Sequence, residues 1–175
     1  MGNDEAAEWA LVCAGDPAGL AALFDRHEAR LFRHACRLLT AREDAKDAVT
    51  IAFFELWRKR ASVRLVEGSP LPWMLNTVAH CARNLERSRR RYGALIARAP
   101  RPDPPRELSG NDESGVLAAL RRLPHREQSV VVLTVLEGYG ERETAQTLGI
   151  PVGTVKSRLT RAREKLRDEM TAMGE

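Results

Sequence analysis

The segment that decides the fold is ERETAQTLGIPVGTVKSRLTRAREKLRD, residues 141–168. Its first eight residues favour a short helix, Gly149 provides a turn, and Pro151 directly precedes a second helix. Apolar residues recur along this second helix at steps of four, three and four, which places them on one stripe: Val155, Leu159, Ala162 and Leu166. The spacing predicts a helix-turn-helix.

The second helix of this unit is cationic at its start. Four cations and no acid lie between Val152 and Arg163. A helix start without carboxylates does not repel phosphate, and the helix dipole favours an anion there. Arginine can bond guanine edges in pairs, while lysine and hydroxyl side chains hold phosphates. The pattern favours a DNA-recognition helix over the alternative, a basic face that is merely solvated.

A second basic helix is expected at about 71–91. Its apolar positions share one side, and from Arg83 to Arg91 it carries five arginines and one glutamate. The opposite side combines amide, imidazole and guanidinium groups that can bond base edges: Asn76, His80, Arg83, Asn84 and Arg87. The alternative is an arginine-rich helix end that complements the dipole and keeps the chain soluble.

The expected helix at about 42–61 has two apolar faces. The core stripe is Val49, Ala52, Phe53 and Leu56. Ile51 and Phe54 fall on the opposite side among charged residues, which indicates a protein-docking site. In the alternative, both residues pack under a neighbouring helix.

The remaining chain also favours helices, at about 4–14, 17–40, 115–122, 125–137, 141–148 and 152–170. The apolar run Val130–Val135 is interpreted as part of a buried helix. Between Gly93 and Gly115 prolines accumulate, and prolines push their predecessors out of helical conformation. We therefore expect an all-α chain with two small helical domains, 1–92 and 114–175, joined by a Pro-rich flexible linker at 93–113.

Composition limits the function classes. The net charge is +4 and the pI about 9.3. The three cysteines are far apart and form no metal or disulfide pattern, which suits a reducing compartment. No signal peptide and no membrane-inserting run is predicted, so a cytoplasmic location is expected. A catalytic motif, a metal site and a cofactor site are also not predicted, so we expect no enzyme and no small-molecule substrate.

These segments resemble the extracytoplasmic-function (ECF, group IV) type of bacterial RNA polymerase sigma factor of the sigma-70 family. REDAKDAVTIAFFELWRKR and GSPLPWMLNTVAHCARNLERSRRR look like parts of a sigma2 domain, and residues 116–166 are similar to a sigma4 domain. The resemblance implies a sigma2-like helical bundle, a sigma4-like helix-turn-helix, and promoter recognition through −10 and −35 elements. It also implies binding to core RNA polymerase and promoter DNA, and control by an anti-sigma factor.

The resemblance implies roles for particular residues. It assigns polymerase docking to five residues of the helix at 42–61: Asp44, Asp47, Ile51, Phe54 and Trp57. It assigns recognition of the −10 element to Asn76, His80, Arg83, Asn84 and Arg87. It also implies that the loop 62–70 captures a flipped non-template base. It assigns recognition of the −35 element to Val152, Thr154, Lys156, Ser157, Arg158 and Arg161. The sequence departs from the family pattern at His80, where Asn is usual, and at Lys46, Thr50 and Ile51, where Glu, Gln and Glu are common.

Two other interpretations fit the residues. The chain could be a repressor or activator that binds duplex DNA through the helix-turn-helix and oligomerises through its first domain. It could also sequester another regulator, with its basic faces contacting an acidic partner. The sigma-factor interpretation explains both basic helices and the apolar patch together.

Overall fold

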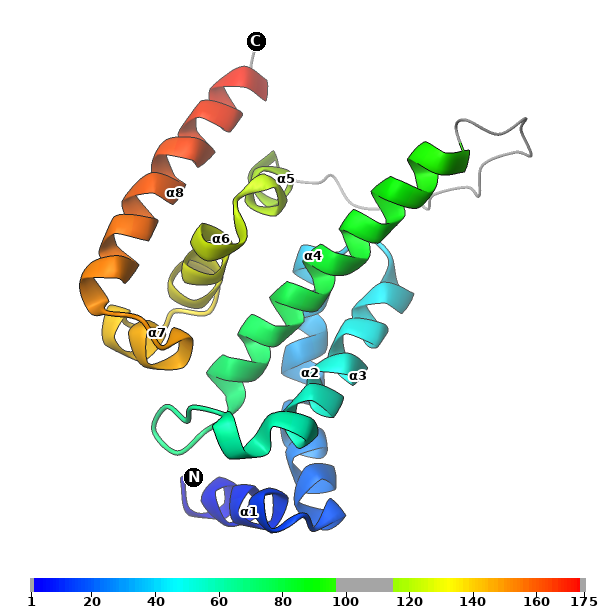
Figure 1. Ribbon diagram of the computed structural model, residues 1–175, viewed down its shortest axis with the longest axis vertical. Helices are drawn as coiled ribbons and strands as arrows, with labels where there is room; N and C mark the ends of the chain where they lie inside the picture. The colour runs from blue at the N-terminus through cyan, green and yellow to red at the C-terminus, as the bar shows by residue number, and fades with distance from the viewer. Residues whose placement is uncertain (1, 97–114, 174–175) are drawn as a thin grey trace.

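The computed structural model describes residues 2–96 and 115–173, and they form helices joined by short connections (Figure 1). The first four helices are α1 (Gly2–Ala14), α2 (Pro17–Leu38), α3 (Arg42–Lys59) and α4 (Leu71–Ile96), with a 3-10 turn, η1 (Arg60–Ser62), after α3. The later helices are α5 (Gly115–Arg122), α6 (His125–Val131), a π-helical turn η2 (Val132–Leu136), α7 (Glu141–Leu148) and α8 (Val152–Met173). The described residues form no strand; Val66 and Ser69 make one isolated bridge. The all-α prediction is confirmed.

Local sequence explains how α2 begins and packs. Gly15 has a φ of 81°, and the Asp16 carboxylate accepts a hydrogen bond from the Ala18 backbone N–H at 2.9 Å. Pro17 occupies the first turn, where a missing N–H costs nothing. At Gly19 a Cβ atom would lie 2.6 Å from the Glu8 carbonyl oxygen, so glycine allows α1 and α2 to touch.

Helices α1 to α4 form the first bundle around an apolar core. The predicted stripe of α3 is buried throughout, from Val49 to Leu56. On α4, Met74, Val78 and Ala82 are buried as the periodicity indicates. Burying one of the larger of these side chains stabilises the folded state by on the order of 1.5–3 kcal/mol. These stripes fix which sides of α3 and α4 remain available for partners.

The second bundle contains α5 to α8 and the predicted helix-turn-helix. Gly149 ends α7 in the left-handed region, with a φ of 64°, and α8 starts at Val152. Val155 and Ala162 are fully buried against the rest of this bundle. The run Val130–Val135 is only partly a buried helix, because it changes to a π-helical turn at Val132 and leaves Val135 62% exposed. Periodicity on a regular helix could not anticipate this change of phase.

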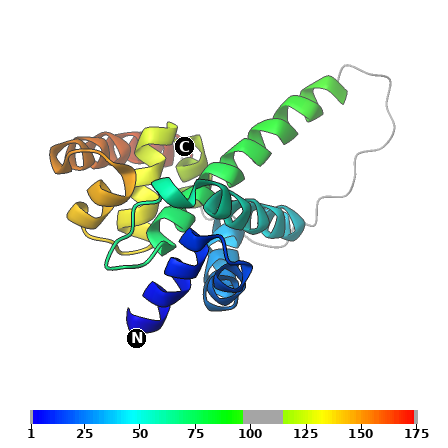
Figure 2. The same ribbon diagram turned by 60° about the horizontal axis from the view of Figure 1, so that its bottom comes forward.

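The two bundles pack against each other along α4. Apolar side chains of both bundles belong to one continuous buried cluster, and α6, η2 and α7 contact α4. Figures 1 and 2 show that the last turns of α4 extend beyond both bundles. Helix α4 also runs through Gly93 to Ile96, past the expected end near residue 91. Most of the predicted linker, 97–113, lies outside the described residues.

No helix in the described part of the chain is both long and apolar enough to cross a bilayer.

Candidate nucleic-acid interface

The predicted −35 residues lie together on the first three turns of α8. Lys156, Ser157 and Arg161 are exposed, and Val152, Thr154 and Arg158 are half-buried. Val155 and Leu159, on the opposite side, anchor the helix in the core. The exposed face can therefore enter a major groove without loss of packing.

Few contacts within the chain occupy this face of α8. The Ser157 hydroxyl donates to the Thr154 carbonyl oxygen at 3.1 Å, which is a contact within one turn. The Lys156 Nζ atom lies 3.6 Å from the Glu141 carboxylate, and both side chains are largely exposed. Such a surface pair contributes about 1 kcal/mol or less, so Lys156 can exchange it for a phosphate.

The predicted −10 residues on α4 are placed differently, because the second bundle packs on this helix. The His80 ring packs against the His125 ring at a tilt of 51°, with ring centroids 3.8 Å apart, and its Nε2 atom lies 3.2 Å from the Ser129 hydroxyl. Burial, followed by the positive charges that surround His80, lowers the pKa of His80 to about 4. The imidazole is therefore neutral near pH 7.

Two more α4 residues are partly removed from solvent. The Arg83 guanidinium donates to the Leu123 carbonyl oxygen at 3.1 Å. The amide oxygen of Asn76 is buried and lacks a hydrogen-bond partner within the described structure. Asn84, the residue directly after Arg83, and Arg87, about one turn further along, are exposed. The predicted α4 face is thus divided into a covered first half and an open second half.

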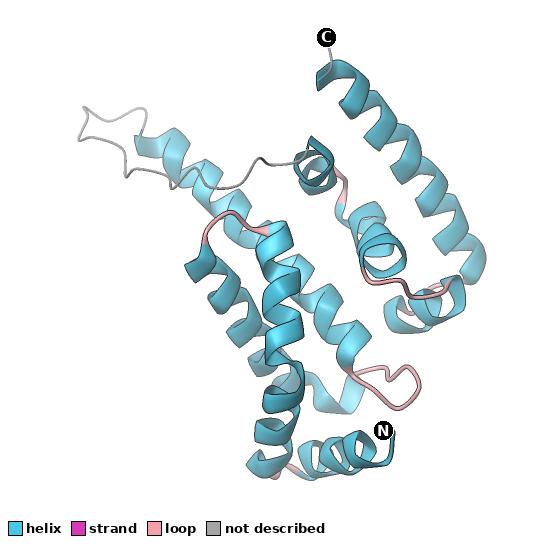
Figure 3. Ribbon diagram, turned by 180° about the vertical axis from the view of Figure 1, so that it is seen from behind, coloured by secondary structure: helices cyan, strands magenta, loops and turns pink. Residues whose placement is uncertain are grey.

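The loop before α4 also contacts the second bundle. Its Leu65 carbonyl oxygen accepts a hydrogen bond from the Gln146 side chain at 2.6 Å. The Arg64 guanidinium lies against Gly149, at the turn of the helix-turn-helix. Figure 3 shows this loop beside α7 from the rear of the molecule. The segment expected to capture a flipped base is therefore in contact with the DNA-reading unit.

On α3 the exposure of the apolar patch is confirmed. Ile51 is 40% exposed and Phe54 is 63% exposed, whereas Trp57 is half-buried. The exposed Asp47 and the half-buried Asp44 share this side of the helix. Neither apolar side chain is buried under a neighbouring helix, so the packing alternative is wrong, and docking at this patch stays a prediction.

Charged residues that form ion pairs with one another lie beside this patch. Glu55 binds Arg58 at 2.7 Å and Lys59 at 2.8 Å. The hydrogen bonds from these two cations lower the pKa of Glu55 to about 2, so the carboxylate remains ionised across the physiological range. The patch is therefore apolar at its centre and charged at its rim.

A charged cluster with a buried centre, which the sequence interpretation missed, joins the two bundles. His34 of α2 is fully buried, and its Nδ1 atom donates to the Glu137 carboxylate at 2.7 Å. Arg30 approaches the same carboxylate at 3.2 Å and Arg37 at 3.5 Å. Burial opposes ionisation of Glu137, but the hydrogen bond and charge of His34, with the two arginines, hold its pKa below the ordinary value. The 103-residue separation of His34 and Glu137 gave no local signal.

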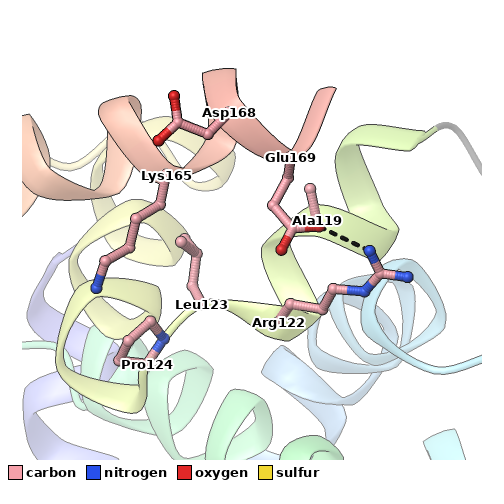
Figure 4. Close-up of a pocket in the computed structure, with 7 residues that line it drawn as sticks. All are labelled: Ala119, Arg122, Leu123, Pro124, Lys165, Asp168 and Glu169. Carbon is pink, nitrogen blue, oxygen red and sulfur yellow. Dashed lines mark hydrogen bonds and ion pairs between the residues drawn. The ribbon is translucent and has the colours of Figure 1, made fainter. Parts of the chain in front are cut away.

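A shallow pocket of about 370 Å³ lies between α5 and α8 (Figure 4). Its lining is Ala119, Arg122, Leu123, Pro124, Lys165, Asp168 and Glu169. Arg122 crosses it to Glu169 at 2.7 Å, and Lys165 pairs with Glu127 at 2.9 Å. The first pair joins α5 to α8 across the pocket, and the second joins α8 to α6. Among the described residues, no three metal-ligating side chains of His, Cys, Asp or Glu form a cluster.

Comparisons with known proteins agree with this geometry. The family Sigma-70 region 2 matches residues 23–92, and Sigma-70, region 4 matches residues 115–166. The chain is 33% identical to the ECF RNA polymerase sigma factor SigM of Mycobacterium tuberculosis over 155 residues, which cover 87% of this chain and 78% of SigM. It is 32% identical to the ECF RNA polymerase sigma factor SigE of Mycolicibacterium smegmatis, covering 88% of this chain and 63% of SigE.

Solved structures show the same fold. The structure of CnrH in complex with the cytosolic domain of CnrY matches with a TM-score of 0.61 and 25% identity, over 96% of this chain and 97% of that one. The sigma factor RpoE in complex with the anti-sigma factor NepR, from Bartonella quintana, matches in fold with a TM-score of 0.53 and 20% identity, over 86% and 96% of the two chains.

The comparisons decide among the three interpretations of the sequence. A duplex-binding repressor and a sequestering protein each account for part of the chain, whereas the two sigma-70 regions together span both bundles. The chain therefore belongs to the ECF family of RNA polymerase sigma factors and is a transcription initiation factor.

Proposed function

We propose that this protein binds core RNA polymerase in the cytoplasm and directs it to promoters, with no catalysis of its own. The proposed domains are 1–92, for polymerase binding and −10 recognition, and 114–175, for −35 recognition, with 93–113 as the linker between them. The observation that carries the proposal is the pairing of an exposed apolar patch on α3 with an exposed cationic face on α8.

The α3 patch has the character of a binding hot spot. Phe54 presents most of its ring to solvent beside Ile51, and ion-paired residues surround them. Burying an exposed aromatic residue at the centre of an interface supplies much of the binding free energy. Polymerase docking through Asp44, Asp47, Ile51, Phe54 and Trp57 therefore remains our assignment.

The exposed face of α8 supplies the −35 contact. Lys156 and Ser157 can hold phosphates, and Arg161 can reach a guanine edge. Asn84 and Arg87 of α4 are open for the −10 element, whereas His80 and Arg83 need the second bundle to move away. Two DNA-reading units on one chain gain joint affinity when the spacing of the DNA elements fits.

An anti-sigma factor is the expected regulator. The fold match to a sigma factor bound by an anti-sigma factor supports this partner class. A protein that covers the α3 patch or the α8 face would compete directly with polymerase or with DNA.

The decisive experiment adds the full chain to core RNA polymerase and maps transcript starts across genomic DNA. Promoter-specific starts above core polymerase alone are expected. Phe54→Ser should weaken association with polymerase by about tenfold or more, because it removes an apolar anchor. Val116→Ser is the matched control, since Val116 is 45% exposed on α5, away from the patch. The absence of specific starts, or equal effects of the two substitutions, would overturn the proposal.

A further inference from the structure

Helix α1 precedes the part of the chain that matches the sigma-70 regions, yet it contacts the loop before α4. The match to Sigma-70 region 2 begins at residue 23, whereas α1 ends at Ala14. Figures 1 and 3 show the first turns of α1 beside the loop between η1 and α4. The contacts of α1 with this loop indicate a role that the family regions do not include.

One carboxylate oxygen of Glu5 links α1 to that loop. The Ser69 hydroxyl donates to Glu5 Oε1 at 2.5 Å, and the Nε2 atom of His27, on α2, lies 2.8 Å from the same oxygen. The His27 side chain is 7% exposed and that of Glu5 is 17% exposed, so water has little access to these bonds. A single oxygen atom therefore joins three segments: α1, α2 and the loop.

Ser69 extends this link to the start of α4. Its Oγ atom accepts a hydrogen bond from the Leu71 backbone N–H at 3.1 Å, while its own hydrogen is donated to Glu5. A hydroxyl can donate one bond and accept another at the same time. The Leu71 N–H is one of the groups that have no partner within a helix at its N-terminus. Glu5 thus orients the side chain that satisfies the first N–H of α4.

The end of the loop is a tight turn that Ser69 closes. Val66 and Ser69 exchange two backbone hydrogen bonds, at 3.0 and 2.9 Å, and the two residues between them have φ values of 51° and 82°. Two consecutive residues with positive φ are typical of the type I′ turn that closes two-residue hairpins. Val66 is also buried. The turn therefore keeps its own shape, and the bond to Glu5 fixes its position on α1.

Helix α1 also lies beside the beginning of the loop, because it contacts η1. A Cβ atom at Gly15, directly after α1, would lie 3.8 Å from the Arg60 guanidinium. That guanidinium lies over the Trp57 ring, 4.9 Å from its centroid, and donates to the Trp57 carbonyl oxygen at 2.8 Å. Both ends of the loop are therefore placed against α1 or the turn that follows it.

Glu5 is not required to attach α1 to α2. Glu8 accepts two hydrogen bonds from Arg26, at 2.8 and 2.5 Å, and Trp9 and Val12 are buried. These contacts hold α1 on the first bundle without involving the loop. The particular contribution of Glu5 is the bond that reaches beyond α2 to Ser69.

We propose that Glu5 is a positioning residue for recognition of the −10 element. Through Ser69 it holds the loop 62–70 and the first turn of α4 in the geometry that receives an unpaired base, and it touches no base itself. The inference rests on the function proposed above for this loop. A loop that is already ordered loses less conformational entropy when it binds, so more of each base contact appears as affinity.

The test uses the full chain bound to core RNA polymerase, on the promoter found by transcript mapping. Open complexes are measured on this promoter and on versions in which one non-template base of the −10 element is changed. Glu5→Ala should lower the preference for the original base by about fivefold at one position, because it removes a positioning hydrogen bond. Ser69→Ala should lower the preference at the same position. Binding to a duplex that carries only the −35 element should stay unchanged.

Glu8→Ala is the matched control, because it makes the same substitution on α1 and removes the pair with Arg26 without touching the loop. Glu5→Gln keeps an oxygen that can accept from Ser69, so it should restore most of the preference. Glu5→Ala with Ser69→Ala should have no larger effect than Ser69→Ala alone, since both remove the same link. Circular dichroism verifies that each variant keeps its helices. If Glu5→Ala loses them, Ser69→Ala alone decides, because it breaks the same bond from the side of the loop.

Two results would overturn the positioning role. One is an unchanged base preference in Glu5→Ala. The other is an equal loss in Glu5→Ala and Glu8→Ala, which would show that α1 only stabilises the first bundle. Specific starts from the wild type together with either result would reject Glu5 alone and leave the sigma-factor function intact. The absence of specific starts from the wild type would overturn the proposed function and this inference with it.

Discussion

Helices α4 and α8 carry similar chemistry but have different surroundings. Both place basic and hydrogen-bonding side chains opposite a buried apolar stripe. On α8 the residues Lys156 and Arg161 face solvent, whereas on α4 His80 and Arg83 face another part of the chain. The difference shows that a DNA-reading pattern defines what a helix can bind, while packing decides when that surface is accessible.

The largest expected effect comes from the open helix. Lys156→Ala with Arg161→Ala should weaken binding to a duplex that carries the mapped −35 element by about 30-fold or more, since each DNA contact contributes about 1–3 kcal/mol. Fluorescence anisotropy of the labelled duplex measures the change. Arg163→Ala with Arg167→Ala removes the same charge further along α8, and an equal loss there would show that only general electrostatic attraction is at work.

Acid should open the covered helix. His125, Lys59 and Arg83 surround His80, whose pKa is about 4 in the closed chain, in which the bundles pack together, against an ordinary value of 6.5. Below pH 6.5 the open form takes up a proton that the closed form excludes, so the closed form loses stability as pH falls from about 6.5 toward 4. The ratio of closed to open chains should fall about tenfold by pH 5.5.

An NMR titration of the His80 ring measures this directly. The wild type should give a pKa near 4, and Glu137→Lys, which breaks the cluster with α2 and lets the bundles separate, should return the pKa toward 6.5. His80→Asn with His125→Asn should remove most of the pH dependence above pH 5. Protonation of Glu137 destabilises the closed form further, but only below pH 4.5, the ordinary pKa of a glutamate. The basic residues around Glu137 hold its pKa in the closed form below that value. A normal His80 pKa in the wild type would contradict the covered position of this ring.

Arg83→Ala should have a smaller effect that depends on the background. In the wild type the substitution removes both a DNA contact and the closing contact to the Leu123 carbonyl, so the two effects partly offset each other. In the Glu137→Lys background only the DNA contact is lost. We expect its effect on promoter binding to be about fivefold larger there. Equal effects in the two backgrounds would mean that Arg83 is accessible from the start.

The smallest effect is expected for Gln146→Ala. It removes one exposed hydrogen bond to the Leu65 carbonyl oxygen, worth about 0.5–1.5 kcal/mol. The population of open chains should rise only a few-fold, well below the effect of Glu137→Lys. Small-angle scattering of both variants compares their populations of open chains. The reverse order would show that the contact of the loop holds the bundles together more strongly than Glu137 does.

Most helix positions followed from the sequence because each depends on neighbouring residues. Pro17 and Gly149 mark helix boundaries through backbone conformation alone, and the buried stripe of α3 follows from its period. The period of α3 left Phe54 open either to exposure or to packing under a neighbouring helix, and the structure decides for exposure. The π-helical turn after Val131 was missed because tertiary contacts, and not local preference, set the phase of that segment.

The sequence by itself determined the helices, their apolar stripes, the helix-turn-helix and the cationic faces, because these features depend on residues within a few turns of each other. Only the tertiary structure decided that His80 meets His125 and that Glu137 enters a basic cluster on α2. Such pairs lie far apart along the chain, so no periodicity or composition records them. Which basic helix is open and which is covered is therefore a property of how the two bundles pack.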